Sequence, residues 1–564
     1  MSSEQLALLG DEAVALGAIH SGISAAYGYP GTPSTEILEY LIAEYERGFA
    51  LANPADAPIA RWCSNEKTAL EAGLGVSFAG RRSIITMKHV GLNVAADPFI
   101  NAALLGIKGG LVIAAADDPG MHSSQNEQDS RFYAAFAMVP CLEPRSQQEA
   151  YDMTREAFEV SEYFQVPVLL RLSTRLSHAR AAIAVKDAPS SWKEKQMPLS
   201  KTTEKNRWML LPALARMNYA ELVEKQKEIR EWSQAHPANK LELPGGGGSD
   251  FAVITSGLGG NYYEENLADL TVMRNGKPPA RLHIGAYPLP EEKIRSLCAV
   301  SEKVMVIEEG QPFIEEKLRG ILPQSIEILG RLDNRSVKIQ EIPRTGELDP
   351  DNVRAALGLP PRPSAAAGLA PASLPARPPQ LCKGCPHADS YDAIKKAVEE
   401  LDPRPGHPDV GINSDIGCYS LGASPPYQVP ESIVCMGASV GMAKGAADAG
   451  LPYSVAVIGD STFIHSGITA LIDTVASNTP MTLIILDNSI VAMTGCQPTM
   501  VPSEKLRALL LGCGVKPEHL LELEARKHLV EENAARLKAE IEYRGLSVVV
   551  FKRECLEAAR KSRK

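Results

Sequence analysis

The stretch SVAVIGDS at residues 454–461, followed by MTLIILDN at 481–488, decides the fold. Each segment is an apolar run of strand-forming residues that ends on polar side chains, Asp460 in the first and Asn488 in the second. Strands that alternate with helices form parallel sheets, and open α/β sheets bind ligands beyond the carboxyl ends of their strands. We therefore expect Asp460 and Asn488 to lie together at a ligand-binding edge.

The chemistry expected at this edge is a divalent cation that holds a diphosphate. Mg²⁺ prefers oxygen ligands, which the Asp460 carboxylate, the Asn488 amide and the main-chain carbonyl of Ile490 would supply. Gly459 lets the backbone approach the ligand, and a helix predicted to begin near Ser466 would direct its amides at phosphate. The alternative is an aspartate that only caps the next helix. The 28 residues from Asp460 to Asn488, between two apolar strands, favour the metal site.

The rest of the chain repeats the alternation of strands and helices. Apolar strands in RRSIITM, GGLVIAAA and VPVLLRL precede residue 180, those in FAVITSG, ARLHIG and VMVIEEG follow a glycine run at 245–248, and LSVVVFKR lies near the end. This pattern predicts an α/β protein with three doubly wound parallel-sheet domains. The predicted segments are an α/β domain at 1–185, a helical connection at 186–245, a second α/β domain at 246–358, a Pro/Ala-rich linker at 359–379 and a third α/β domain at 380–564.

Composition excludes several classes of function. A net charge of −10 and a pI near 5.7 argue against a protein that neutralises nucleic-acid phosphates. The first residues lack the basic region of a signal peptide, and no apolar run is long enough for membrane insertion, so we expect a cytoplasmic protein. In that reducing compartment, ten cysteines are candidates for metal or cluster ligands rather than disulfides.

The residues Gly459-Asp460-Ser461, followed at this distance by Asn488, resemble the thiamine diphosphate fingerprint. The surrounding sequence is similar to that of the alpha subunit of indolepyruvate:ferredoxin oxidoreductase, within the 2-oxoacid:ferredoxin oxidoreductase superfamily. The matching stretches, in order along the chain, are AYGYPGTPSTE (26–36), NEKTALEAGLGVSFAGRRSIITMKHVGLNVAADP (65–98), DDPGMHSSQNEQDSR (117–131), LCKGCPH (381–387), SDIGCYSLG (414–422), CMGASVGMAKG (435–445), and IGDSTFIHSGI through LDNSIVAMTGCQP.

The resemblance implies a site for thiamine diphosphate between two thiamine diphosphate-binding folds, the first binding the pyrimidine and the last the diphosphate, across a dimer of this chain. Glu66, in SNEK, is implied as the glutamate that hydrogen-bonds the aminopyrimidine; read without the family, it is a helix-start acid favoured by the dipole. Thr32, in YPGTPS, looks like the substrate-contacting threonine, and its alternative role is a helix N-cap.

Further polar residues are implied around the cofactor and the substrate. His122 heads a group of loop residues that would bind the substrate carboxylate or polarise its 2-oxo group; read alone, such loop residues are simply solvated. The other members of this group are Lys88, Asn93, Ser123 and Ser124. Residues implied to contact the cofactor are Gly437, Thr494, Gln497 and Cys418.

Oxidative decarboxylation releases two electrons, and the superfamily passes them to a [4Fe–4S] cluster. The implied ligands here are Cys382, Cys385, Cys418 and Cys555, and four thiolates suit such a cluster. Zn²⁺ also accepts four thiolates, and free cysteines often only pack. Cys496 and Cys513 compete with Cys555 for the fourth position.

Two departures from the family pattern concern electron transfer. The sequence ends at RKSRK without the usual ferredoxin-like segment, so we expect electrons to pass to a partner subunit or to ferredoxin, and Lys383 stands where the family has proline. The leading hypothesis is the large subunit of a hetero-oligomeric, arylpyruvate-type oxidoreductase that works with a small gamma-type or beta subunit and uses coenzyme A as co-substrate. The alternatives are a non-oxidative thiamine diphosphate-dependent decarboxylase or carboligase and a non-catalytic thiamine diphosphate-binding protein.

Overall fold

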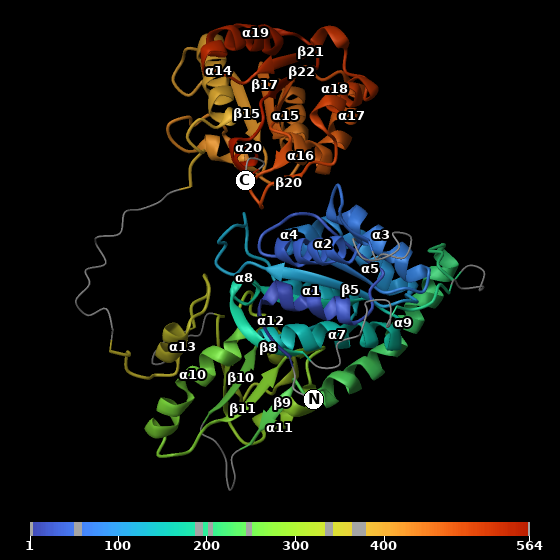
Figure 1. Ribbon diagram of the computed structural model, residues 1–564. Helices are drawn as coiled ribbons and strands as arrows, with labels where there is room; N and C mark the ends of the chain where they lie inside the picture. Colours follow the sequence, from blue (N-terminus) through green and yellow to red (C-terminus); the bar gives the residue numbers. More distant parts are fainter. Residues whose placement is uncertain are drawn as a thin grey trace. The chain divides into compact units, whose positions relative to one another are not determined.

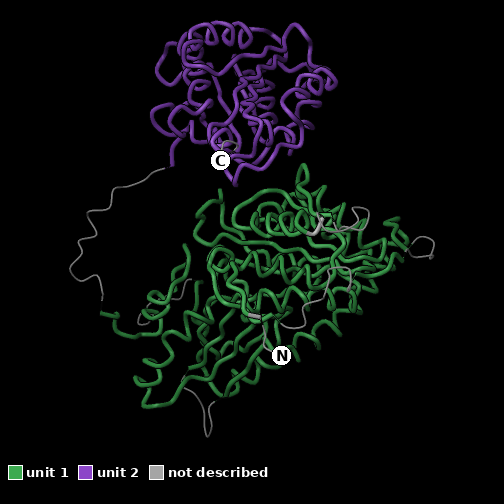
Figure 2. Tube along the Cα trace, in the orientation of Figure 1, with its two compact units in different colours: residues 1–369 green, residues 370–564 purple. Residues whose placement is uncertain are grey.

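The computed structural model describes residues 4–49, 59–185, 196–200, 207–243, 251–332, 342–363 and 379–561. The chain divides into two compact units, residues 1–369 and 370–564, which are described separately (Figure 2). The glycine run at 245–248 and most of the predicted Pro/Ala linker, at 364–378, lie outside the described residues.

The first unit contains a seven-stranded sheet of order β12-β6-β7-β5-β4-β2-β3. Six strands are parallel: β2 (Ala25–Gly28), β3 (Ile59–Trp62), β4 (Ser83–Lys88), β5 (Leu111–Asp117), β6 (Cys141–Leu142) and β7 (Val168–Ser173). Every residue of β5 and β7 is buried, as expected for parallel strands covered on both faces. The covering helices include α1 (Gly10–His20), α2 (Thr35–Phe49), α3 (Glu66–Phe78), α4 (His89–Val94), α5 (Ala96–Leu105), α6 (Ser130–Ala137) and α7 (Gln147–Phe164) (Figure 1).

A second sheet in this unit has the order β14-β13-β10-β11-β9. Its strands are β9 (Lys240–Glu242), β10 (Ala252–Ser256), β11 (Ala280–Ile284), β13 (Lys303–Ile307) and β14 (Glu327–Leu329). All are parallel except β9, which pairs antiparallel with β11 at the edge. Its helices are α10 (Leu258–Met273), α11 (Glu291–Cys298), α12 (Phe313–Ile321) and α13 (Pro350–Ala356), and the long α9 (Pro212–Ala235) precedes it.

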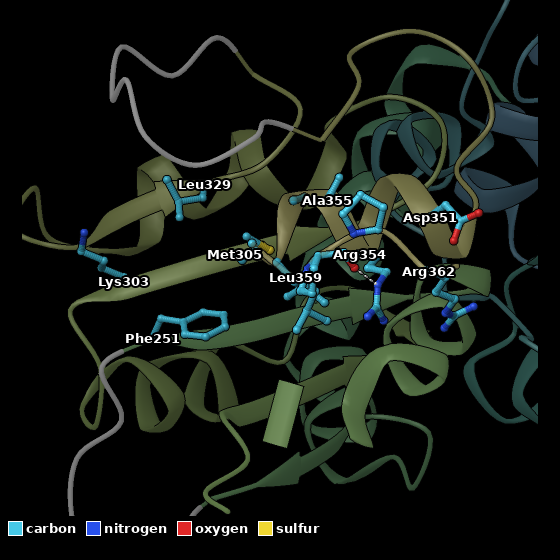
Figure 3. A pocket seen from close by; sticks show the side chains of 14 residues that line it. Phe251, Lys303, Met305, Leu329, Asp351, Arg354, Ala355, Leu359 and Arg362 are labelled. Atoms are coloured by element: carbon cyan, nitrogen blue, oxygen red, sulfur yellow. Dashed lines mark hydrogen bonds between the residues drawn. The ribbon is translucent and has the colours of Figure 1, made fainter. Parts of the chain in front are cut away.

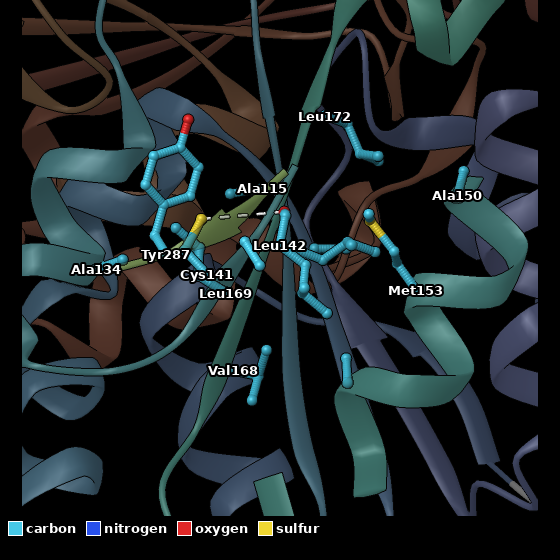
Figure 4. Close-up of a cluster of buried hydrophobic side chains, with 14 of the residues drawn as sticks. Ala115, Ala134, Cys141, Leu142, Ala150, Met153, Val168, Leu169, Leu172 and Tyr287 are labelled. Atoms are coloured by element: carbon cyan, nitrogen blue, oxygen red, sulfur yellow. Dashed lines mark hydrogen bonds between the residues drawn. The ribbon is translucent and has the colours of Figure 1, made fainter. Parts of the chain in front are cut away.

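Short strands connect segments that are distant in the sequence. β12 (Ala286–Tyr287) leaves the second sheet and pairs antiparallel with β6, which brings Tyr287 beside Cys141 in the apolar core (Figure 4). A two-stranded antiparallel ribbon joins β1 (Glu4–Leu9) to β8 (Arg180–Val185), after the short helix α8 (Thr174–His178). These antiparallel pairs, and β9, depart from the purely parallel sheets that the sequence predicts.

The second unit is a six-stranded, all-parallel sheet of order β16-β15-β17-β18-β22-β21. Its strands are β15 (Val410–Ser414), β16 (Ser432–Ile433), β17 (Tyr453–Gly459), β18 (Thr482–Asp487), β21 (Leu520–Glu524) and β22 (Ser547–Lys552). Its helices are α14 (Pro386–Leu401), α15 (Ala438–Asp448), α17 (Ile468–Ser477), α18 (Ser503–Gly512), α19 (Val530–Glu542) and α20 (Leu556–Lys561), with 3₁₀ turns at η3 (Cys418–Ala423), η5 (Pro517–His519) and η6 (Lys527–Leu529).

The pleat of these strands divides their side chains between two apolar cores. Val455 and Val457 face the core under α14 and α19, whereas Ala456 and Ile458 face the core under α15, α17 and α18. The sheet is therefore covered by helices on both faces, which confirms the doubly wound α/β class (Figure 1).

The parallel sheets of the two units share one strand order. If the parallel strands of each sheet are numbered along the chain, both sheets read 2-1-3-4-6-5: β3-β2-β4-β5-β7-β6 in the first unit and β16-β15-β17-β18-β22-β21 in the second. Equivalent strand ends in the two sheets can therefore be compared directly.

A buried ionic network joins the first sheet to the second within the first unit. Arg131 forms ion pairs with Asp129 and Glu308, at 2.5 and 3.0 Å, and donates to the Tyr287 hydroxyl at 3.2 Å. Arg171 pairs with Asp117 at 2.6 Å and with the Glu143 carboxylate. Burial raises the pKa of Glu308 to about 7, although the charge of Arg131 opposes this effect.

We expect Arg131→Met to destabilise the first unit by about 3–5 kcal/mol, because it removes the basic partner of the buried Glu308 and leaves Asp129 with only Arg171, at 3.5 Å. All four tryptophans of the chain precede residue 369, so tryptophan fluorescence during urea unfolding follows this unit. The matched control is Arg47→Met, which breaks the exposed Arg47–Glu44 pair and should cost less than about 1 kcal/mol. Equal, small losses in the two variants would show that the network contributes little to stability.

Candidate functional site

Asp460 and Asn488 lie at the carboxyl ends of the neighbouring parallel strands β17 and β18. The Asp460 carboxylate accepts hydrogen bonds from the amide of Ser461 at 2.7 Å and from the amide of Ser489 at 2.9 Å. Ser489 directly follows Asn488, so the backbone after one strand holds the carboxylate that ends the other. The predicted convergence of the two residues is present in the structure.

The helix after β17 begins at Asp460, and its predicted start near Ser466 is wrong. α16 (Asp460–Thr462) continues through the π-helical turn η4 (Phe463–Gly467) into α17. The free amides of the helix start therefore lie beside Asp460 itself. A π-helical turn at this point is a feature that often accompanies functional sites.

The electrostatics of Asp460 fit a bound cation. The residue is only 7% exposed, and burial, followed by the charge of Asp487, raises the pKa of its carboxyl group to about 8. No basic side chain of the described residues forms an ion pair with Asp460. A divalent cation would supply the missing positive charge, and carboxylate and amide oxygens are suitable ligands for it.

Asn488 is held in one orientation by its neighbours. Its Nδ2 lies 3.1 Å from Nε2 of His387, and its Oδ1 accepts from the amide of Ile490 at 3.1 Å. Burial and the charge of Arg553 lower the pKa of His387 to about 4, so its ring is neutral and Nε2 can accept from the amide. The Asn488 oxygen therefore faces away from His387.

The other residues predicted at the cofactor lie on nearby loops of the same unit. Gly437, at φ +87°, precedes α15, and a Cβ there would lie 2.5 Å from the Cβ of Ser466 in η4. Thr494 donates to the Gln497 side chain at 2.6 Å, in the turn between β19 (Ile490–Val491) and β20 (Gln497–Pro498), which follows Asn488.

Cysteines from four segments lie at this end of the second unit. Burial, followed by the charges of Cys385, Cys555, Cys382 and Cys496, raises the pKa of Cys418 to about 12. The amide of Cys555 also donates to the main-chain oxygen of Asn488 at 3.3 Å. Within the described ranges, no group of three or more His, Cys, Asp and Glu side chains is arranged to hold a single metal ion.

In the first unit, Glu66 is the first residue of α3 and is 5% exposed. The preceding Asn65 caps the helix by accepting from the amide of Thr68 at 2.8 Å. Gly91 lies against the glutamate, because a Cβ at this position would be 2.5 Å from Glu66 Oε1. Only a glycine fits there while Glu66 keeps this conformation.

Three of the predicted substrate residues come together at the carboxyl edge of the first sheet. Lys88 donates to the main-chain oxygen of Ser123 at 3.1 Å, and the Ser123 hydroxyl donates to the main-chain oxygen of Thr32 at 3.1 Å. Burial lowers the pKa of Lys88 to about 8, although the charges of Asp118 and Glu66 oppose this effect. Glu66 and Lys88 are therefore electrostatic neighbours.

The structure also places the other residues predicted at the substrate. Helix α2 begins at Thr35, three residues after Thr32, so the alternative role of Thr32 as an N-cap is wrong. His122 is largely exposed and lies 3.3 Å from Glu347, which also binds Arg175. Ser124 donates to Asp118 at 2.7 Å, and Asn93 accepts a hydrogen bond from the Tyr133 hydroxyl.

Sequence reasoning missed four residues that shape these sites: Gly91, Asp118, His387 and Asp487. Two of them carry a usable signal, because Asp118 and Asp487 each lie at or just beyond the end of an apolar strand. A separate cavity of about 840 Å³ lies at the second sheet, lined by residues of β13, β14 and α13, and contains none of the predicted site residues (Figure 3).

Comparison with known proteins supports the assignment of both units. Residues 16–238 match the family model "Pyruvate flavodoxin/ferredoxin oxidoreductase, thiamine diP-bdg", and residues 415–549 match "Thiamine pyrophosphate enzyme, C-terminal TPP binding domain". Indolepyruvate oxidoreductase subunit IorA of Archaeoglobus fulgidus is 36% identical, over 98% of this chain and 86% of that protein. The chain belongs to the IorA family. The IorA of Methanothermobacter thermautotrophicus is 34% identical, over 98% of this chain and 87% of its own length.

Membership of the IorA family confirms the predicted class of enzyme, a thiamine diphosphate-dependent oxidoreductase subunit with two thiamine diphosphate-binding domains. A solved 2-oxoglutarate:ferredoxin oxidoreductase from Magnetococcus marinus matches 58% of this chain and 62% of that chain, with 17% identity and a TM-score of 0.47. Among the described residues of this IorA-family chain, no helix is long and apolar enough to cross a membrane.

We expect Lys88→Met to stabilise the first unit at neutral pH. A pKa of about 8 for Lys88, against an ordinary 10.5, means that burying the charged ammonium costs about 3 kcal/mol below pH 8. Above pH 10.5 the lysine is neutral whether folded or unfolded, so this cost disappears. The stability difference between variant and wild type, measured by tryptophan fluorescence, should therefore be largest below pH 8 and shrink towards pH 10.5.

The control is Lys67→Met on the outer face of α3, where the lysine is 45% exposed. Its stability difference from wild type should not change over the same pH range. A Lys88→Met curve that is parallel to the wild type at every pH would contradict the burial of this charge.

Proposed function

We propose that this chain is the thiamine-containing large subunit of an indolepyruvate-type 2-oxoacid oxidoreductase. The reaction converts a 2-oxo acid and coenzyme A to an acyl-CoA, CO₂, one proton and two electrons. The observation that carries the proposal is the buried Asp460 carboxylate, which has no basic partner in the described part of the chain and lies beside Asn488. The relatives named indolepyruvate oxidoreductase support an arylpyruvate as substrate.

In this proposal, Asp460, Asn488 and the main-chain oxygen of Ile490 hold Mg²⁺, which binds the diphosphate of the cofactor. The bound thiamine diphosphate supplies the carbon nucleophile that attacks 2-oxo acids. Gly459 and Ser461 lie on either side of the carboxylate, and the Ser461 amide already fixes one of its oxygens. This chain thus orients the ligand oxygens before the cation arrives.

Glu66 is proposed to hydrogen-bond the aminopyrimidine ring and hold the proton needed there. Burial keeps water away from its carboxyl group, and Gly91 fixes its position. Thr32, Lys88 and His122 are proposed to contact the substrate, with the Lys88 ammonium as the partner of its carboxylate. A partly desolvated ammonium attracts an anion more strongly than a solvated one.

The two electrons are proposed to leave through a [4Fe–4S] cluster on Cys382, Cys385, Cys418 and Cys555. The charges of Cys385, Cys555 and Cys382 all raise the pKa of Cys418, and this supports the assignment because such effects act over short distances. Cys496 belongs to the same set and is the competing fourth ligand. We further propose that a small partner subunit, with ferredoxin or another electron carrier, completes a hetero-oligomer that contains two copies of this chain.

We expect Asp460→Ala and Asn488→Ala to abolish Mg²⁺-dependent binding of thiamine diphosphate, because each removes a metal ligand. Isothermal titration calorimetry on the full chain, with and without Mg²⁺, measures this binding. Asp473→Ala is the control, since Asp473 lies on the same helical run but is 71% exposed. Undiminished binding by Asp460→Ala would contradict the metal assignment.

Glu66→Gln should keep the binding of thiamine diphosphate and lose about 10²–10⁴-fold in turnover. The control Glu71→Gln, at an exposed site on α3, should keep both the binding and the turnover.

We expect anaerobically purified protein to contain iron and acid-labile sulfide and to absorb visible light. Cys382→Ser should lower the iron content, because the thiolate is lost. Cys298→Ser, in the first unit, should leave it unchanged. A colourless wild-type protein that decarboxylates 2-oxo acids would favour the non-oxidative alternative.

A further inference from the structure

Asn488 is fixed in the structure from two directions by segments that are distant in sequence. His387, 101 residues earlier, accepts from its side-chain Nδ2 at 3.1 Å. The amide of Cys555 donates to its main-chain oxygen at 3.3 Å. Both the side chain and the backbone of this residue are therefore restrained before any ligand binds.

The contact with His387 decides which end of the Asn488 amide faces the ligand edge. The side-chain nitrogen of Asn488 can only donate, so Nε2 of His387, 3.1 Å from it, is the acceptor of this hydrogen bond. If the amide rotated by half a turn, two acceptors would face each other and both hydrogen bonds of the side chain would be lost. His387 thus directs Oδ1, the atom that binds hard cations, away from itself.

His387 is itself firmly held. It lies in the first turn of α14, after Pro386 at the first helical position, and is 3% exposed. Its ring packs edge-on against Tyr419, with centroids 6.0 Å apart and an interplanar angle of 82°. Arg553 binds the preceding loop by donating to the main-chain oxygen of Gly384. The acceptor nitrogen therefore has little freedom to move away from Asn488.

We propose that His387 is a positioning residue that holds the Asn488 amide with its oxygen towards the metal. This inference rests on the proposed function, because it assumes that Asn488 binds the cation of the thiamine diphosphate site. Groups that orient metal ligands commonly change metal affinity by about 10–100-fold when they are removed. The imidazole contacts the ligand and not the metal, so its effect passes through Asn488 alone.

The test measures Mg²⁺-dependent thiamine diphosphate binding to the full chain by isothermal titration calorimetry. We expect His387→Ala to weaken binding about 10–100-fold. His387→Gln should recover a large part of the loss, because its side-chain oxygen can accept from Asn488 Nδ2. Tyr391→Phe is the matched control: it lies on the same helix and also removes one buried hydrogen bond, to the main-chain oxygen of Tyr419, without touching Asn488.

A double-mutant cycle separates positioning from a general loss of structure. If His387 acts through Asn488, His387→Ala should have no further effect on the residual binding of Asn488→Asp, whose carboxylate has no amide end to orient. An unchanged affinity in His387→Ala, or an equal loss in both backgrounds, would overturn the inference. Wild-type protein that binds no thiamine diphosphate with Mg²⁺ would instead overturn the proposed function on which it rests.

Discussion

A carboxylate removed from water is stabilised by a compensating charge, and the two units of this chain differ in how they supply one. In the first unit, Asp129 and Glu308 form ion pairs with the guanidinium of Arg131 inside the fold. In the second unit, Asp460 is equally well buried, yet its charged neighbour is another acid, Asp487. Desolvation without a countercharge is costly, and a cation that binds from outside would repay it. The charge balance therefore differs between the two clusters, and together with the nearby Asn488 it supports a ligand site in the second unit.

The shared strand order of the two parallel sheets shows how similar folds carry different chemistry. The third strand of the first unit ends at Lys88, and Asp460 directly follows the third strand of the second unit. After the second strand, the first unit begins a helix at Glu66, whereas the second unit places Gly437 before its helix. The carboxyl ends of parallel strands meet at one edge in each sheet, so a change of one side chain there changes the local charge without changing the fold.

Much of the fold could be predicted from the sequence because the parallel strands are continuous apolar runs, buried on both faces. β5, β17 and β18 lie where their runs predict them. β9 and β12, with three and two residues, carry no periodic pattern, and they form only because distant segments offer them an edge. Pairing that depends on tertiary contacts leaves no local signal.

For the site residues too, position along the chain could be predicted from local sequence, whereas contacts that depend on the tertiary fold could not. Asp460 and Asn488 could be identified because each stands at the end of a strand, whereas Glu66 and Lys88 are implied only by the resemblance to the family. What these residues touch could not be read from the sequence: His122 meets Glu347 from 225 residues away, and Asn488 meets His387 across 101 residues. Sequence position places a side chain at an edge, whereas only the fold decides its partners.

Two of the thiol-bearing segments of the second unit also hold Asn488. His387 follows Cys385 by two residues, and the Cys555 amide binds the main-chain oxygen of Asn488. The pKa of Cys418 responds to the charges of Cys385 and Cys555, so these segments are close in space as well as jointly in contact with Asn488. A displacement of either segment would move the amide that ends β18. The position of Asn488 and the positions of these thiols therefore depend on the same backbone and side-chain contacts.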